Sequence, residues 1–264
     1  MKINPKAVRR TIIEMLYKAK ASHLGSSMSV VECLTAMYGN VDIEKIKAKQ
    51  PDRSRVIVSK GHCASATYAT MHHYGLLTAE QIKTYHENGS LLQGHVSHGV
   101  PHVEHSTGAL GHGLPVAVGV AIGLRSLKFN DAKVLCLVGD GEIQEGSIWE
   151  ALMLAHHHRL SNLSIIIDNN QISSITDTHK VIDLNPLKDR FEGFGLQTFE
   201  VNGHNVEELD KAIKEGFQGE TATAIIANTI KGKGVPFAEG QPIWHYRSLS
   251  DDDYKNIVSI LEAE

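Results

Sequence analysis

Two segments decide the fold of this 264-residue chain: Val134-Leu-Cys-Leu-Val-Gly-Asp-Gly141 and Leu163-Ser-Ile-Ile-Ile-Asp-Asn-Asn170. Each is an apolar run of strand length that ends in a polar turn, and a helix-length interval separates them. This pattern is typical of two parallel strands joined by a helical crossover. The carboxyl ends of such strands meet at one edge of the sheet, where open α/β sheets bind ligands. The sequence therefore predicts that Asp140 and Asn170 lie side by side at a ligand-binding edge.

One carboxylate and one amide that converge at this edge suit a hard cation. Mg²⁺ takes oxygen ligands in an octahedron and usually leaves positions for phosphate oxygens and water. The glycines on either side of Asp140 let the backbone approach a ligand closely. A Gly-Asp-Gly turn is also typical of a plain strand-to-helix connection with Asx turns. Its position between two apolar strands favours the cation site.

Strand-like and helix-like segments alternate along the rest of the chain. Further strands are predicted at three places: 55–59, 197–201 and 222–227. Apolar spacing, a capping box at 78–81 and runs of small residues predict helices in the intervals and at both ends: 8–19, from 78, 113–127, from 206, and 249–264. We therefore expect an α/β fold with a parallel sheet and helices on both of its faces. No linker or repeat divides the sequence, which predicts a single domain over residues 1–264.

Composition and charge exclude several classes of protein. The apolar content of 42% and charged content of 21% are ordinary for a soluble globular protein. A net charge of −4 without any basic block predicts neither nucleic acid nor a membrane surface as a partner. The first residues, 1–6, contain no apolar leader, so we expect a cytoplasmic protein. Cys33, Cys63 and Cys136 lack metal-ligand spacing, which predicts buried free thiols.

Several further segments occur in the order of the motifs of one family. They are Ser22-His-Leu-Gly-Ser-Ser27, Ser59-Lys-Gly-His62, Gly94-His95, Ser106-Thr-Gly-Ala-Leu-Gly-His-Gly113, Gly139-Asp-Gly-Glu-Ile-Gln-Glu-Gly146, Thr229-Ile-Lys-Gly-Lys-Gly-Val235 and Trp244-His245. Together they resemble the transketolase family, and the Gly-Asp-Gly and Asn-Asn turns resemble its thiamine diphosphate fingerprint. The resemblance spans nearly the whole chain, but only the amino-terminal, diphosphate-binding half of a full-length transketolase. It implies the thiamine diphosphate-binding fold and the smaller, amino-terminal subunit of a split, two-gene transketolase.

The resemblance also implies a site for thiamine diphosphate and Mg²⁺, with Ca²⁺ or Mn²⁺ as alternative ions. Asp140 and Asn170 would hold the ion through their side chains, and Ile172 would hold it through its backbone carbonyl. Gly141 would let the diphosphate lie against the backbone. The other cofactor-binding residues that the resemblance implies are Gly108, Leu110, Glu145, Ile230, His62 and His245.

Three of these residues have simpler interpretations. Leu110 resembles the apolar residue that keeps the two rings of the cofactor folded toward each other; the simpler alternative for Leu110 and Ile230 is that they are core residues. Glu145 matches a family glutamate at the subunit contact. A glutamate in the first turn of a helix, favoured by the helix dipole, would look the same.

Four of the 16 histidines match active-site histidines of the family: His23, His62, His95 and His245. The ordinary pKa of imidazole lies near neutrality, which suits proton transfer to and from sugar hydroxyls. The resemblance implies that His23 and His95 contact the carbonyl oxygen and hydroxyls of the donor. His62 and His245 would lie near the diphosphate and the reacting carbons. The remaining histidines lack a cysteine pair or His-Glu-x-x-His spacing, so a zinc site has no support.

Some positions depart from the family pattern. Leu24 stands where proline is common, Ser22 where glycine leads the motif, and His112 where glutamine is familiar. Arg247, in an ending that differs from that of sugar-phosphate transketolases, is either an anion-binding residue or a structural surface arginine. These departures leave the identity of the sugar open.

The resemblance implies transfer of a two-carbon ketol unit from a ketose donor to an aldose acceptor, with sugars or sugar phosphates as substrates. Enzymes of this family take an activating glutamate from a pyrimidine-binding domain, which we expect on a separate carboxy-terminal subunit in an α2β2 heterotetramer. One alternative is a subunit that resembles deoxyxylulose-phosphate synthase or decarboxylates 2-oxo acids, which His-Leu-Gly-Ser-Ser supports. The full set of histidines favours a hydroxylated sugar donor. Another alternative is a non-catalytic assembly subunit.

Overall fold

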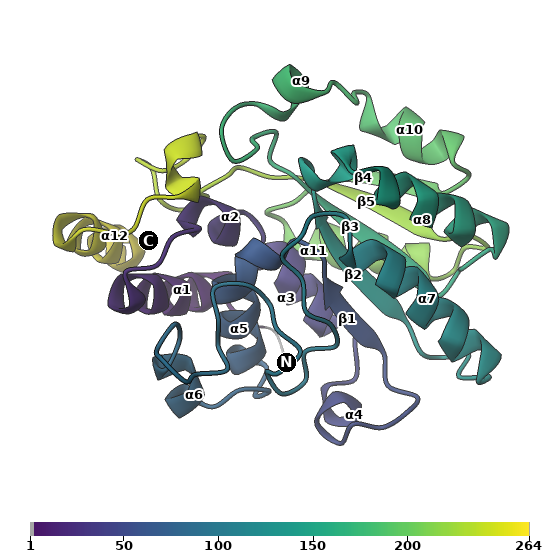
Figure 1. Ribbon diagram of the computed structural model, residues 1–264, viewed down its shortest axis with the longest axis horizontal. Coiled ribbons are helices and arrows are strands. Elements are labelled where there is room, and N and C mark those ends of the chain that lie inside the picture. Colours follow the sequence, from purple (N-terminus) through teal and green to yellow (C-terminus); the bar gives the residue numbers. More distant parts are fainter. Residues whose placement is uncertain (1–2, 264) are drawn as a thin grey trace.

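A five-stranded sheet, in which every pair of neighbouring strands is parallel, forms the centre of the molecule (Figure 1). The computed structural model describes residues 3–263. The strands are β1 (Arg55–Val58), β2 (Val134–Gly139), β3 (Leu163–Asn169), β4 (Gln197–Asn202) and β5 (Thr223–Asn228), in the order β1-β2-β3-β5-β4. All five predicted strands are confirmed.

Helices cover both faces of this sheet (Figure 1). The α-helices are α1 (Pro5–Ala19), α2 (Leu24–Ser29), α3 (Val31–Gly39), α4 (Ile43–Lys47), α5 (Ala64–His73), α6 (Ala79–Lys83), α7 (Gly113–Ser126), α8 (Gly146–His157), α9 (Thr178–Val181), α10 (Leu187–Gly193), α11 (Val206–Gly216) and α12 (Asp251–Ala263). Three short 3₁₀ turns are η1 (Gly61–Cys63), η2 (Glu142–Gln144) and η3 (Pro242–His245). Helices α7, α8 and α10 pack on one face, and α3 and α11 pack on the other, with α1 and α5 outside α3.

Successive residues of the strands enter two separate cores. Leu135 and Leu137 of β2 pack toward α1, α3 and α5, whereas Cys136 and Val138 pack toward α7 and α8. Every residue of β2 and β3 is buried. This double burial explains why these strands are almost continuously apolar rather than alternating. The predicted parallel sheet between two helical layers is thus confirmed.

Local capping explains where two of the predicted helices begin. Thr78 and Gln81 form the predicted capping box at the start of α6. The last helix begins at Asp251, two residues later than predicted, because Ser250 caps it. The Asp253 amide donates to Ser250 Oγ at 3.1 Å, and the Ser250 amide donates to Asp253 Oδ2 at 3.0 Å. The predicted end at Glu264 lies outside the described residues.

All three cysteines are buried and free, as predicted. Across residues 3–263, none of the helices combines the length and the apolar character needed to span a bilayer.

The sheet brings four turns to one edge. Lys60 follows β1, Asp140 follows β2, Asn170 follows β3 and Lys231 follows β5. In β2 and β3, Gly139 pairs with Asp168, so the turns after these strands start level with each other. The parallel register therefore places the polar residues after all four strands around the same space.

The double burial of the sheet makes a prediction about stability. Ile166→Ala should lower the free energy of unfolding by about 2–5 kcal/mol, because it opens a cavity in a fully buried strand. Ile175→Ala is the matched control, since Ile175 is 74% exposed and its loss should change stability by less than about 0.5 kcal/mol. Urea denaturation of the purified variants measures both. Equal losses would contradict the central position of β3.

Candidate active site

A cavity of about 440 Å³ lies at the carboxyl edge of the sheet. Most of the residues that the sequence suggested for a site line it: His23, His62, His95, Gly108, Leu110, Asp140, Gly141, Glu145, Asn170, Ile172 and His245. Ile230 does not line this cavity. It borders a neighbouring hollow that shares Asn170, Ile172 and Lys231 with the main one.

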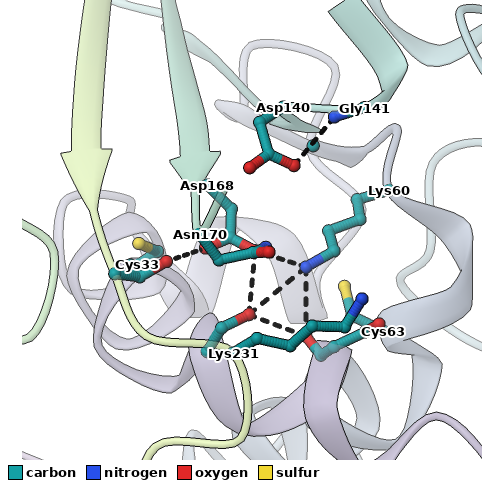
Figure 2. A network of polar contacts seen from close by, with 12 residues as sticks. Cys33, Lys60, Cys63, Asp140, Gly141, Asp168, Asn170 and Lys231 are labelled. Atoms are coloured by element: carbon teal, nitrogen blue, oxygen red, sulfur yellow. Dashed lines mark hydrogen bonds and ion pairs between the residues drawn. The ribbon is translucent and has the colours of Figure 1, made fainter. Parts of the chain in front are cut away.

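A buried ion pair forms the floor of the site (Figure 2). Lys60 and Asp168 have side chains that are 3% and 0% exposed, and the lysine ammonium donates to Asp168 Oδ2. Burial disfavours the charge of Lys60, but Asp168 outweighs it and raises the pKa of the ammonium. Burial likewise opposes the charge of Asp168, yet Lys60 and its hydrogen bonds keep the pKa of this carboxyl below its ordinary value. Both partners are therefore ionised at neutral pH.

Asp168 fixes the orientation of Asn170. Asn170 Nδ2 donates to Asp168 Oδ2 at 2.8 Å. An ionised carboxylate can only accept, so the amide nitrogen must face it and the amide oxygen must point the other way. That oxygen accepts the Ile172 amide at 3.1 Å and keeps a second lone pair. Asp168 therefore fixes the direction of the Asn170 amide oxygen, which is the predicted metal ligand.

Asp140 is a buried carboxylate that forms no ion pair with any cation among residues 3–263. It is 6% exposed, and its oxygens accept the backbone amides of Gly141, at 2.8 Å, and Gln171. Burial, and then the charge of Asp168, raises the pKa of Asp140 to about 7. A carboxyl in this state is stabilised as an anion by any cation that binds beside it.

These residues fit a magnesium ion. The donors are one carboxylate, one amide oxygen and the carbonyl of Ile172, all of them the hard oxygens that Mg²⁺ prefers. In the described part of the chain, no group of three or more His, Cys, Asp or Glu side chains is arranged to bind a metal. A zinc site built from the extra histidines therefore gains no support, whereas the mixed oxygen set remains available.

Lys231 is a residue of this site that the sequence reasoning missed. It is 2% exposed, and its ammonium donates to the carbonyls of Ile172 at 3.1 Å and Ser173 at 2.6 Å. Burial, and then the charge of Lys60, lowers the pKa of Lys231 to about 8. Its position beside the predicted ligand carbonyl gives the site a positive charge that can attract an anion.

Glu142 joins three segments around the cavity, and the sequence reasoning did not single it out. This residue is 1% exposed, and its carboxylate accepts the amides of Gly111 at 2.9 Å and Gly139 at 3.0 Å. Ser59 Oγ donates to the same carboxylate and accepts the Gly113 amide at 3.0 Å. The Gly-Asp-Gly turn is therefore fixed relative to the end of β1 and to the loop before α7.

Four imidazoles gather on one side of the cavity. The ring of His23 lies 5.7 Å from His62, 5.4 Å from His95 and 5.1 Å from His245, between ring centroids. His62 and His245 are 5.0 Å apart. Ser26 Oγ lies 3.3 Å from Nδ1 of His245, which restrains that ring. These residues come from the start of α2, η1, η3 and a loop, so only the fold brings them together.

The surroundings of this cluster keep the imidazoles neutral. Burial, and then His95, lowers the pKa of His23 to about 4. Burial, and then Lys231, lowers the pKa of His245 to about 3. Burial also lowers the pKa of His62, and burial with the nearby His86 lowers that of His95. A neutral imidazole has one donor and one acceptor nitrogen, so the cluster can bind several hydroxyl groups.

The remaining residues that the sequence singled out lie at the rim or outside. Leu110 is 39% exposed at the cavity wall, so it is not a core residue. Glu145 is the N-cap residue of α8 rather than part of its first turn, and it too lines the cavity. His112 is exposed and outside the cavity. The Arg247 guanidinium lies 4.9 Å from the ring of Trp244 and 3.6 Å from Asp253, which supports the structural interpretation.

Comparison with known proteins identifies the family. Residues 2–263 match the family described as "Transketolase, thiamine diphosphate binding domain". The chain belongs to the transketolase family. The predicted family and fold are therefore confirmed.

Relatives in this family include proteins that are named as subunits. The chain is 39% identical to one of the subunits of the apulose-4-phosphate transketolase of Phocaeicola vulgatus, over 95% of this chain and 89% of that protein. It is 32% identical to 6-deoxy-6-sulfo-D-fructose transketolase subunit SqwG of a Clostridium species, over 97% and 94%. The chain thus matches nearly the whole length of proteins that are themselves named subunits.

Solved transketolases share the fold but are longer. The transketolase of Campylobacter jejuni superposes with a TM-score of 0.88 at 29% identity, over 98% of this chain and 43% of that one. That of Leishmania mexicana gives a TM-score of 0.88 at 28% identity, over 98% and 40%. The chain therefore spans less than half the length of these transketolases.

The buried ion pair predicts a large effect of one substitution. Lys60→Met should lower the free energy of unfolding by about 3–5 kcal/mol, because it leaves the charge of Asp168 buried without a partner. Adding Asp168→Asn should recover part of this loss. The control is Lys214→Met on α11, where the lysine pairs with Asp210 while 60% exposed, so that its loss should cost less than about 1 kcal/mol. Chemical denaturation tests this, and equal effects of the two lysine variants would refute it.

The neutral state of His245 predicts a dependence of stability on pH. The unfolded chain takes up a proton on this residue below about pH 6.5, whereas the folded chain resists protonation until about pH 3. The contribution of His245 to stability is therefore complete above about pH 6.5 and is lost as the pH falls from about 6.5 to about 3. His245→Gln should lose less stability than the unmodified chain between about pH 7 and about pH 5. Urea titrations at several pH values measure the difference, with exposed His157→Gln as the control, and parallel curves for all three would contradict the assignment.

Proposed function

We propose that this chain is the diphosphate-binding subunit of a two-subunit transketolase. With thiamine diphosphate and Mg²⁺, it transfers a two-carbon ketol unit from a ketose to an aldose. The observation that carries this proposal is the meeting, in one cavity, of an oxygen donor set at the sheet edge and four neutral imidazoles. A cation site alone would suit many enzymes. The imidazole cluster beside it suits a substrate rich in hydroxyl groups, and so favours a sugar.

The donor set would hold the metal and the diphosphate. Asp140, Asn170 and the carbonyl of Ile172 would bind the Mg²⁺, and the ammonium of Lys231 beside them would attract the diphosphate. Gly141 leaves the cavity wall open, since a Cβ there would meet no atom closer than 3.9 Å. When bound, thiamine diphosphate supplies the electron sink that cleavage and formation of the carbon–carbon bond require.

The imidazoles would bind the sugar and exchange protons with it. A Cβ added at Gly108 would lie 3.6 Å from His95 Cδ2, and the ring of His23 lies beside His95. On this side of the cavity, His23 and His95 would bind the carbonyl oxygen and hydroxyls of the donor. His62 and His245 would lie nearer the diphosphate and exchange protons with the oxygen atoms next to the reacting carbons. Such proton transfer by a positioned side chain accelerates a reaction by about 10²- to 10⁴-fold.

A partner subunit would complete the site. The relatives that match over most of their length are named subunits, and large apolar side chains at the cavity are exposed: Leu110, Ile175, Val181 and Tyr246. We propose that a chain with a pyrimidine-binding domain covers them, contributes the activating glutamate near Glu145, and forms an α2β2 heterotetramer. Both relatives are named for sugars with a phosphate or sulfo group, which favours an anionic donor sugar. The buried free thiols suit a cytoplasmic enzyme.

Reconstitution tests the proposed division of labour. The purified chain alone should show no ketol transfer, because the activating glutamate is on the partner. Adding the pyrimidine-domain chain, thiamine diphosphate and Mg²⁺ should produce transfer between a ketose and an aldose, and no carbon dioxide from pyruvate. Chromatographic analysis of the sugars measures the reaction. Robust transfer by the chain alone, or decarboxylation without transfer, would overturn the proposal.

Variants of the complex identify the residues that act. His95→Ala should lower kcat/KM by about 10²- to 10⁴-fold, whereas His112→Ala, outside the cavity, should leave it unchanged. Asp140→Ala should abolish Mg²⁺-dependent uptake of thiamine diphosphate in calorimetry. A non-catalytic assembly subunit would show none of these effects, since the activity would not depend on its cavity.

A further inference from the structure

A chain of hydrogen bonds links the amino-terminal helices to the loop after β5. Arg9 of α1 binds Glu32 of α3 through two contacts, of 2.5 and 2.9 Å, and both side chains are less than a tenth exposed. Glu32 Oε2 also lies 3.1 Å from Nδ1 of His204. On the other side of the ring, the Ile230 amide donates to Nε2 of His204 at 2.8 Å. His204, in the turn after β4, therefore connects a buried ion pair to the backbone of the loop.

The partners of His204 define its tautomer. Burial opposes the charge of Glu32, but the hydrogen bonds from His204 and Arg9 outweigh burial and keep the pKa of this carboxyl below its ordinary value. Glu32 is therefore ionised and can only accept, so Nδ1 of His204 carries the proton. Nε2 must present a lone pair, because the amide of Ile230 can only donate. His204 is thus a neutral imidazole with a fixed donor side and a fixed acceptor side.

The loop that His204 contacts forms part of the candidate site. Ile230 precedes Lys231, whose ammonium lies on the carbonyls of Ile172 and Ser173. Gly232 and Gly234 have φ values of +82° and +87°, so the backbone on this side is intrinsically permissive. The Gly232 amide donates to Gly25 O at 2.9 Å. The glycines leave the loop after β5 conformationally free, so contacts from distant elements fix its position.

Arg9 reinforces the same segment from the opposite end. Its Nε donates to the Lys233 carbonyl at 3.1 Å, so the Arg9–Glu32 pair holds Lys233 directly and Ile230 through His204. Neither Arg9, Glu32 nor His204 lines the cavity. Any effect of His204 on the cofactor must therefore act through the position of the loop.

We infer that His204 is a positioning residue, whose ring fixes the Ile230 backbone and thereby sets Lys231 against the carbonyls of the metal and diphosphate site. This inference rests on the proposed function, because the ligand it concerns is thiamine diphosphate with Mg²⁺. Without the acceptor at Nε2, the Ile230 amide loses its partner and the loop loses its anchor between Thr229 and Lys231. A displacement of about 1 Å in a positioned group is enough to weaken a site severely.

Three substitutions test the inference in the assembled two-subunit complex. His204→Phe keeps the size of the ring and removes both nitrogens. His204→Asn keeps a donor for Glu32 but places no acceptor near Ile230. His204→Gln offers an amide oxygen and nitrogen separated about as widely as the two ring nitrogens, so it can serve both partners. His73→Phe is the matched control, since this partly buried histidine joins α5 to Thr11 of α1 and does not line the cavity.

Two measurements separate positioning from stability. Calorimetry of thiamine diphosphate binding in the presence of Mg²⁺ should show affinities roughly 3- to 10-fold weaker for the Phe and Asn variants, because the Ile230 amide loses its acceptor. The Gln variant should recover most of the affinity, and His73→Phe should match the unmodified protein. Hydrogen exchange without the cofactor should accelerate at residues 229–233 in the Phe and Asn variants, while β5 (Thr223–Asn228) stays protected.

The outcomes distinguish the two proposals. If the unmodified complex does not bind thiamine diphosphate, the proposed function fails, whatever His204 does. If the complex binds it and the Phe and Asn variants bind equally well with unchanged exchange at 229–233, His204 does not position the loop. If His204→Phe also accelerates hydrogen exchange in β5, the fold itself is disturbed and the test rests on His204→Asn. An affinity of His204→Asn for thiamine diphosphate within twofold of the unmodified protein would then overturn the inference.

Discussion

The site depends on one buried carboxylate, that of Asp168 at the end of β3. It has no exposed surface and accepts hydrogen bonds from four segments: Lys60 after β1, Ser29 of α2, Thr229 after β5 and Asn170. The charge of Lys60 makes this burial tolerable, since an unpaired carboxylate would be strongly destabilising there. The ion pair adds little net stability, but its hydrogen bonds fix how the four segments meet, and with them the direction of the Asn170 oxygen.

Charged side chains of both signs lie above this pair. Asp168 balances Lys60, and the other charged side chains that line the cavity are Lys231, Asp140, Glu142 and Glu145. With a pKa of about 7, Asp140 is only partly ionised at neutral pH, whereas the ammonium of Lys231, with a pKa of about 8, is mostly charged. A divalent cation beside Asp140 would ionise this carboxyl fully, and the cation and Lys231 would together attract a diphosphate.

The sequence could predict the parts of the structure that depend on local pattern. Apolar runs of strand length gave the five strands, and the turns after β2 and β3 marked Asp140 and Asn170. It could not assign Lys60, Glu142 or Lys231, because their roles arise from contacts between segments distant in sequence. Lys231 and Lys233 look alike in Thr229-Ile-Lys-Gly-Lys-Gly-Val235, yet the first is buried against Ile172 and the second reaches Glu239 at 3.6 Å on the surface. Nothing in the sequence around His204 indicates a role, because that role depends on its contacts with Glu32 and Ile230, which are distant in sequence.

The lysines at the floor add to the effect of burial on the pKa values of the histidines. Lys60 and Lys231 contribute, after burial, to the lowered pKa values of His23, His62 and His245. A bound diphosphate would offset these positive charges and place its own negative charge beside the rings, and both effects raise the pKa of an imidazole. A diphosphate bound beside these lysines would therefore make the imidazoles more basic, while burial would still hold their pKa values down.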